Sequence, residues 1–129
     1  MQINSFSDLL VAARQQVEPQ RLLFVFVKAE VTKQADAAHG QTGGYLNPVV
    51  CVDKLPEEIA SFADLVRESK NTGVEWDMVF IASMSGRAGF APNSDEAAQA
   101  LKMMVEAVQG GRISNFICCD LNGELVSFY

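Results

Sequence analysis

Apolar residues follow two different spacings along the chain, and the alternation between them predicts alternating helices and strands. Three segments carry apolar residues at helical spacing, namely 6–17, 59–66 and 97–108. Three continuous apolar runs rich in β-branched and aromatic residues predict strands, namely 22–27, 48–52 and 78–82. The first of these runs is apolar on both faces, so we expect a central strand that is covered on two sides.

Residues with special backbone properties mark the ends of the helices. Ser5 is typical of an N-cap, and Pro19 ends the first helix. Pro56 is expected at the first position of the second helix. Asn93 or Ser94 is expected to cap the third. These boundaries predict about three main helices.

The C-terminal segment predicts two more strands, 113–120 and 124–128, joined by a tight turn at Asn122-Gly123. Two successive strand–helix–strand units imply right-handed crossovers and parallel pairing. We therefore expect one α/β domain over residues 1–129. Its mixed sheet is expected to have about five strands, with a parallel core and a C-terminal antiparallel hairpin.

The polar stretch between the first two strands leaves one part of this topology open. It predicts a short helix over 33–39, followed by a glycine-rich segment at 41–44. The length of this connection does not decide whether the first strand runs parallel or antiparallel to the others.

Charge and hydropathy exclude two classes of partner. The net charge of −6 repels phosphate backbones, and the ten Lys and Arg residues are scattered, so we expect no nucleic-acid partner. No apolar run approaches the roughly 20 residues that span a bilayer, and the N-terminal residues lack the pattern of a signal peptide. We expect a cytoplasmic protein without membrane contact.

The sequence contains no recognisable catalytic or metal-binding set, so we expect no cofactor, no metal and no catalytic residue. His39 is the one histidine, and no Cys-x-x-Cys motif is present. A Cys51–His39 dyad is formally possible, but Cys51 lies in an apolar run where burial raises a thiol pKa. Cys118 and Cys119 are adjacent on one expected strand, so they point to opposite faces and favour free core thiols.

Polar residues follow the second and third expected strands. If both strands end at the same edge of the sheet, these residues form a strand-end rim that is suited to a small polar or anionic ligand. The residues of the strand-end rim are Asp53, Lys54, Ser83, Ser85, Gly86 and Arg87.

The alternative is that the same residues only build the fold. Asp53 then caps the next helix, Ser85-Gly86 turns the chain, and Arg87 pairs with an acidic residue at the start of the following helix. The acidic residues Asp95 and Glu96 already occupy the positive end of that helix, which disfavours a phosphate there.

Three segments resemble those of a known group of sequences: residues 18–26 (EPQRLLFVF), 51–56 (CVDKLP) and 85–89 (SGRAG). The group consists of short bacterial proteins labelled ribonucleotide reductase subunit alpha, and the resemblance extends over most of the chain. A reductase large subunit would need a far longer barrel and a facing pair of redox cysteines. Because Cys118 and Cys119 are adjacent, the resemblance implies a small stand-alone protein onto which no reductase residue can be transferred.

Two functions are consistent with these observations. The first is a non-catalytic interaction protein that forms a homodimer, because Met103, Phe128 and Tyr129 are apolar residues that a lone domain would expose. The second is a ligand-binding protein or enzyme that uses the strand-end rim. The lack of a recognisable nucleophile or base favours the first.

Overall fold

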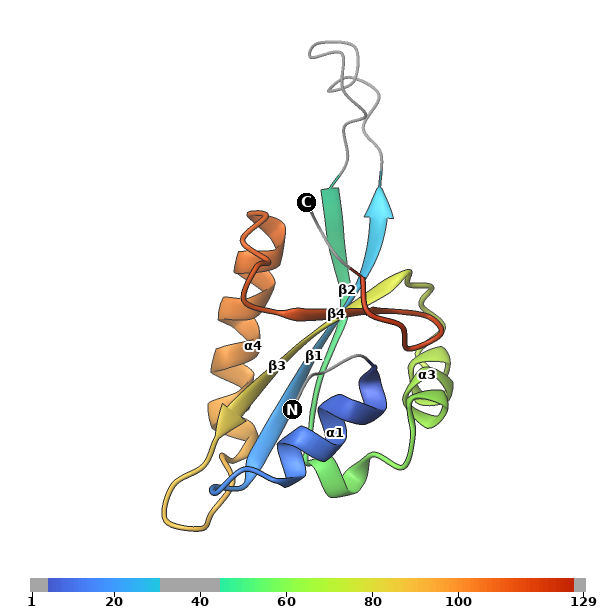
Figure 1. Cartoon of the computed structure of the whole chain (residues 1–129). Coiled ribbons are helices and arrows are strands. Elements are labelled where there is room, and N and C mark those ends of the chain that lie inside the picture. Colours follow the sequence, from blue (N-terminus) through green and yellow to red (C-terminus); the bar gives the residue numbers. More distant parts are fainter. Residues whose placement is uncertain (1–4, 31–44, 127–129) are drawn as a thin grey trace.

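The strand β1 (Gln20–Glu30) is the element around which the rest of the chain is arranged (Figure 1). It pairs with β2 (Tyr45–Lys54) on one side and with β3 (Met78–Ser85) on the other. All six residues from Leu22 to Val27 are buried, which confirms the expected central strand. The computed structural model describes residues 5–30 and 45–126, and the expected helix over 33–39 lies outside them.

The sheet contains four strands within the described residues, in the order β2-β1-β3-β4, where β4 spans Ile117–Asp120. Every neighbouring pair is antiparallel. The expectation of about five strands with a parallel core was therefore wrong. β2 and β3 do run in the same direction, but β1 lies between them and is antiparallel to both. The hydrophobic pattern identifies strands, but it does not say which of them are neighbours.

Helices cover both faces of this sheet (Figure 1). On one face, α1 (Phe6–Arg14) and α3 (Phe62–Lys70) contribute to a core cluster that includes Phe24 and Phe26. On the other face, α4 (Ser94–Gln109) packs in a second cluster with Val25 and Phe80. The two clusters divide the side chains of β1 by strict alternation, as expected for a strand buried on both sides.

The helices differ from the sequence expectation in two places. α1 is capped by Ser5, whose Oγ accepts a hydrogen bond from the backbone N–H of Asp8 at 3.3 Å. The helix ends at Arg14, so Val17 is 98% exposed instead of belonging to the buried stripe. The second expected helix is divided into a 3₁₀ turn at Pro56–Glu58 and α3.

A second N-cap explains this division. The hydroxyl of Ser61 accepts a hydrogen bond from the backbone N–H of Asp64 at 3.1 Å, so the α-helix begins after Ser61 and not at Pro56. The new start rotates the buried face, and Leu65 is buried whereas Ala63 is exposed.

The expected C-terminal hairpin is present only in part. β4 begins at Ile117, because residues 113–116 form a turn in which the N–H of Phe116 donates to the carbonyl of Ile113. The tight turn forms at Gly123, with φ of 81°. Glu124 and Leu125 make isolated bridges instead of a fifth strand, and residues 127–129 lie outside the described part.

Two phenylalanines provide a direct test of this core. Phe24 is 0% exposed at the centre of β1, whereas Phe90 is 77% exposed in the loop after β3. We expect Phe24→Ala to lower the free energy of unfolding by about 3–5 kcal/mol, because it removes a fully buried ring. The matched Phe90→Ala change should stay within about 0.5 kcal/mol of wild type. Urea unfolding measures both values, and equal effects would contradict the burial described.

Candidate functional site

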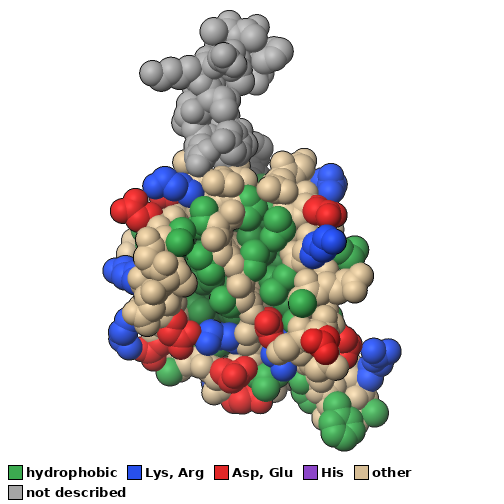
Figure 2. Space-filling model, turned by 180° about the vertical axis from the view of Figure 1, so that it is seen from behind, with side chains coloured by type: hydrophobic (Ala, Val, Ile, Leu, Met, Phe, Trp, Pro, Cys, Tyr) green, Lys and Arg blue, Asp and Glu red, His purple; other side chains and the backbone are tan. Residues whose placement is uncertain are grey.

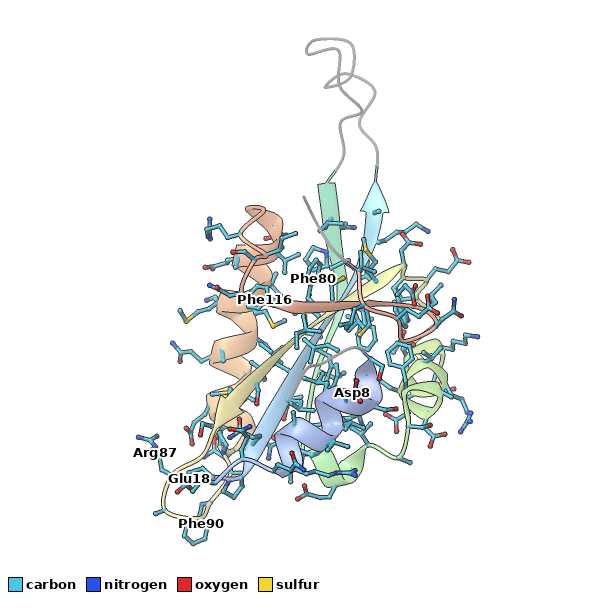
Figure 3. The ribbon with its side chains drawn as sticks, in the orientation of Figure 1. Asp8, Glu18, Phe80, Arg87, Phe90 and Phe116 are labelled. Atoms are coloured by element: carbon cyan, nitrogen blue, oxygen red, sulfur yellow. The ribbon has the colours of Figure 1, made fainter. Side chains whose placement is uncertain are left out.

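The loop after β3 is a tight turn with both of its arms fixed. The N–H of Arg87 donates to the carbonyl of Phe90, and the N–H of Phe90 donates back to the carbonyl of Arg87, both at 2.9 Å. Ala88 and Gly89 lie between them with φ of 53° and 81°. Two successive positive φ angles are typical of a type I′ turn. Figure 3 shows Arg87 and Phe90 pointing away from the body of the molecule.

This loop is bound to the chain that precedes β1. The N–H of Gly86 donates to the carbonyl of Pro19 at 2.8 Å, and the N–H of Gly89 donates to Oε2 of Glu18 at 2.9 Å. A side chain at Gly86 would place Cβ 2.0 Å from the carbonyl oxygen of Phe90. Gly86 is therefore required for the close approach of two backbone segments, and its glycine does not imply a phosphate site.

The two serines of the strand-end rim are joined by a buried glutamine. The hydroxyl of Ser83 donates to Oε1 of Gln20 at 2.6 Å, and Nε2 of Gln20 donates to Oγ of Ser85 at 3.2 Å. Gln20 also donates to the carbonyl of Glu18. These bonds tie the end of β3 to the start of β1.

Asp53 serves as an anchor for α4. Its Oδ2 lies 2.6 Å from Nη1 of Arg21 and accepts a weaker bond from the hydroxyl of Ser94 at 3.3 Å. Nε of the same arginine donates to the carbonyl of Pro92 at 2.6 Å. Arg21 and Asp53 thus hold the start of α4 against β1 and β2. The alternative interpretation, in which Asp53 caps the helix that follows it, was wrong on this point.

Lys54 and Arg87 have acidic partners in different places. Nζ of Lys54 lies 2.7 Å from Oε2 of Glu68 in α3. Arg87, which is 87% exposed, lies 3.5 Å from Glu96 at the start of α4, the pairing named in the alternative. The strand-end rim therefore consists of separate contacts, and most of them hold the fold together.

The register explains why the rim residues do not converge. Lys54 of β2 and Ser83 of β3 both lie opposite Leu22, so they share the face of α1 and α3 but are separated by the width of β1. Asp53 lies opposite Leu23 and belongs to the face of α4. Neighbouring residues of one strand point to opposite faces, so the side chains of Asp53 and Lys54 are directed to different faces of the sheet.

A groove of about 390 Å³, which was not predicted from the sequence, lies between β2 and α3. We call it the β2–α3 groove. It is lined by Phe26, Val50, Cys51, Val52, Asp53, Lys54, Leu65, Glu68, Ser69 and Thr72. The apolar stripe of α3 and the run 48–52 were both visible in the sequence. That they enclose a groove depends on β2 being an edge strand.

The outer edge of β2 is the second feature that the sequence did not reveal. β2 pairs with β1 alone in the described sheet, at the end of the strand order. The segment Val49–Val52 carries no charge, and the register with β1 shifts at its start, where Phe26 lies opposite Val50 and Val27 opposite Pro48. Figure 2, which is seen from the side of β2, shows apolar side chains across the middle of this face and charged ones around them.

All three cysteines have raised pKa values, which disfavours the reactive thiolate form. Cys118 and Cys119 are buried free thiols in different core clusters, which confirms that they point to opposite faces. Burial raises the pKa of Cys118 to about 12 and that of Cys119 to about 11. Cys51 lies exposed on β2, and partial burial of its thiol raises its pKa as well. His39 lies outside the described residues, so the Cys51–His39 dyad remains a sequence hypothesis.

The remaining predicted residues are placed as follows. Met103 is 66% exposed on α4, and Phe128 and Tyr129 lie outside the described residues. Within the described ranges, no three His, Cys, Asp or Glu side chains are grouped as a metal site. None of the described helices has both the length and the apolar character needed to cross a membrane.

Comparison with known proteins adds no assignment. No family model, no curated protein and no solved structure matches the chain. The resemblance of three segments to the short bacterial proteins therefore stays an expectation from the sequence.

The type I′ turn predicts a stabilising substitution. Ala88 has φ of 53°, a left-handed conformation that is unfavourable for a residue with a Cβ atom. We expect Ala88→Gly to raise the free energy of unfolding by about 0.5–1 kcal/mol. The control is Ala91→Gly, because Ala91 does not have a positive φ. There the glycine only adds entropy to the unfolded chain, so the substitution should be neutral or destabilising. Chemical denaturation of both variants measures this, and a loss of stability in Ala88→Gly would contradict the turn.

Proposed function

We propose that this protein is a non-catalytic interaction protein that forms a homodimer through the outer edge of β2. The observation that carries the proposal is the uncharged segment Val49–Val52, three half-buried valines and the exposed Cys51, on a strand with one described neighbour. An edge strand presents a row of backbone N–H and C=O groups to any chain that can pair with them.

Soluble proteins commonly protect such edges with charges, proline or bulges. On β2, Pro48 and the register irregularity lie near the middle of the strand, and Asp53 and Lys54 lie at its C-terminal end. The segment Val50–Val52 between them lacks these devices. A partner strand would satisfy the backbone groups and cover the apolar side chains on both faces.

A second copy of the chain is the occupant that the geometry favours. Two β2 strands related by a two-fold axis pair antiparallel, and the helical layers of the two copies then continue each other. β2 has ten residues, which corresponds to a length of about 34 Å. With helices on both faces, this side is about 20 Å wide. The resulting area of roughly 700 Å² per copy is close to that of a stable interface.

The chemistry of the strand-end rim supports the non-catalytic part of the proposal. Asp53, Ser83 and Ser85 are engaged in contacts that hold α4 and the ends of β1 and β3. The raised pKa values of the buried cysteines keep them protonated near neutral pH. Three free thiols also favour the reducing environment of the cytosol.

Two exposed positions separate the β2 edge from α4 as the interface. Lysine at Cys51 places two like charges close to the two-fold axis, whereas lysine at Met103 adds the same charge to an exposed position on α4. We expect Cys51→Lys to raise the dimer dissociation constant at least tenfold, by roughly 1.4 kcal/mol or more, and Met103→Lys to leave it unchanged. Sedimentation velocity over a micromolar concentration series measures both.

A wild-type protein that stays monomeric throughout the series would reject the homodimer. Weakening by Met103→Lys alone would move the interface to α4. Circular dichroism of both variants checks that the fold is retained.

A further inference from the structure

The β2–α3 groove has a lining of two chemical kinds. Its floor is apolar and consists of the buried side chains of Phe26 and Leu65 and the half-buried side chains of Val50 and Val52. At one end lies the ammonium group of Lys54 with its partner Glu68. The volume of about 390 Å³ lies within the range of small-molecule sites.

The hydroxyl groups on the wall are already occupied as donors. Oγ of Ser69 donates to the carbonyl of Val66 and accepts a bond from Nε1 of Trp76 at 2.7 Å. Oγ1 of Thr72 donates to the carbonyl of Ser69 and accepts a bond from the N–H of Val74. A hydroxyl has one hydrogen to donate, so sugars and other ligands with many polar groups find few partners here.

The charge at the end of the groove selects the sign of the ligand. Lys54 is half-buried, whereas Glu68 on α3 is exposed. Within the described residues, the ion pair with Lys54 is the one contact that holds the Glu68 carboxylate. A partly exposed ion pair exchanges partners at modest cost, so an incoming anion can bind the ammonium group while Glu68 turns to solvent. Asp53, the neighbouring carboxylate on β2, is directed to the other face and bound to Arg21.

We propose that the β2–α3 groove binds an amphipathic carboxylate, with its hydrocarbon chain on the floor and its carboxylate at Lys54. Apolar burial and a charge-assisted hydrogen bond then act on the same molecule. The groove lies within one chain, so this inference does not rest on the proposed homodimer. Because residues 50–54 of β2 form one wall, a paired β2 strand would lie beside the bound ligand.

The structure contains its own reporter for this site. Trp76 is the one tryptophan of the chain, and it is buried against Phe26 with ring centroids 4.8 Å apart. It also donates to Ser69 on the groove wall. A ligand on the floor should therefore change the emission of Trp76 in a saturable manner.

The test titrates the full chain with octanoate and octanol, both below the concentrations at which they aggregate, and follows Trp76 emission. We expect octanoate to bind at least about tenfold more tightly than octanol, because only octanoate can pair with Lys54. Lys54→Met should remove this advantage and leave octanol binding unchanged. Lys70→Met, at an exposed position at the end of α3, is the matched control and should retain it.

A further variant separates ligand binding from a structural role of the ion pair. Glu68→Gln removes the anion that competes for Lys54, so we expect it to bind octanoate more tightly than wild type. Repeating the titration on wild-type protein diluted below the dimer dissociation constant distinguishes this inference from the proposed function, since octanoate should bind a monomeric chain as well. The absence of a saturable response, equal binding of octanoate and octanol, or full octanoate affinity in Lys54→Met would each overturn the assignment.

Discussion

The burial of β1 on both faces is the constraint on which the rest of this structure depends. Six consecutive apolar side chains, from Leu22 to Val27, must each be removed from water, and a single layer of helices can cover only every second one. The chain therefore needs α4 on one face and α1 with α3 on the other. β2 and β3 satisfy the backbone of β1 along both of its edges.

This arrangement also determines where the chain is open. With β1 in the centre, β2 becomes the end of the sheet, and its uncharged middle segment is left beside α3. The free edge and the β2–α3 groove are two consequences of the same placement. One offers backbone groups to a partner strand, and the other offers an apolar floor with a single cation at its end.

The sequence predicted the elements better than their neighbours. The central strand, the N-caps at Ser5 and Asn93 and the buried stripe of α4 follow from local spacing and were confirmed. The order of strands was missed, because an apolar run such as 48–52 is the same in a parallel and an antiparallel sheet. The strand-end rim was predicted from strand direction alone, so Asp53 and Lys54 were assigned to one site although alternation places them on opposite faces. The groove forms only when α3 packs beside β2 in the folded chain, and the local sequence pattern does not predict that packing.

Hydrogen–deuterium exchange of the β2 backbone tests the central claim most directly, because it reports on the edge itself. Amides of β2 that point away from β1 have no described strand to bind. If a second copy pairs there, protection of the segment Val49–Val52 should rise with protein concentration through the micromolar range, while amides of β1 stay protected throughout. Exchange of Val49–Val52 that does not change with concentration would contradict the account.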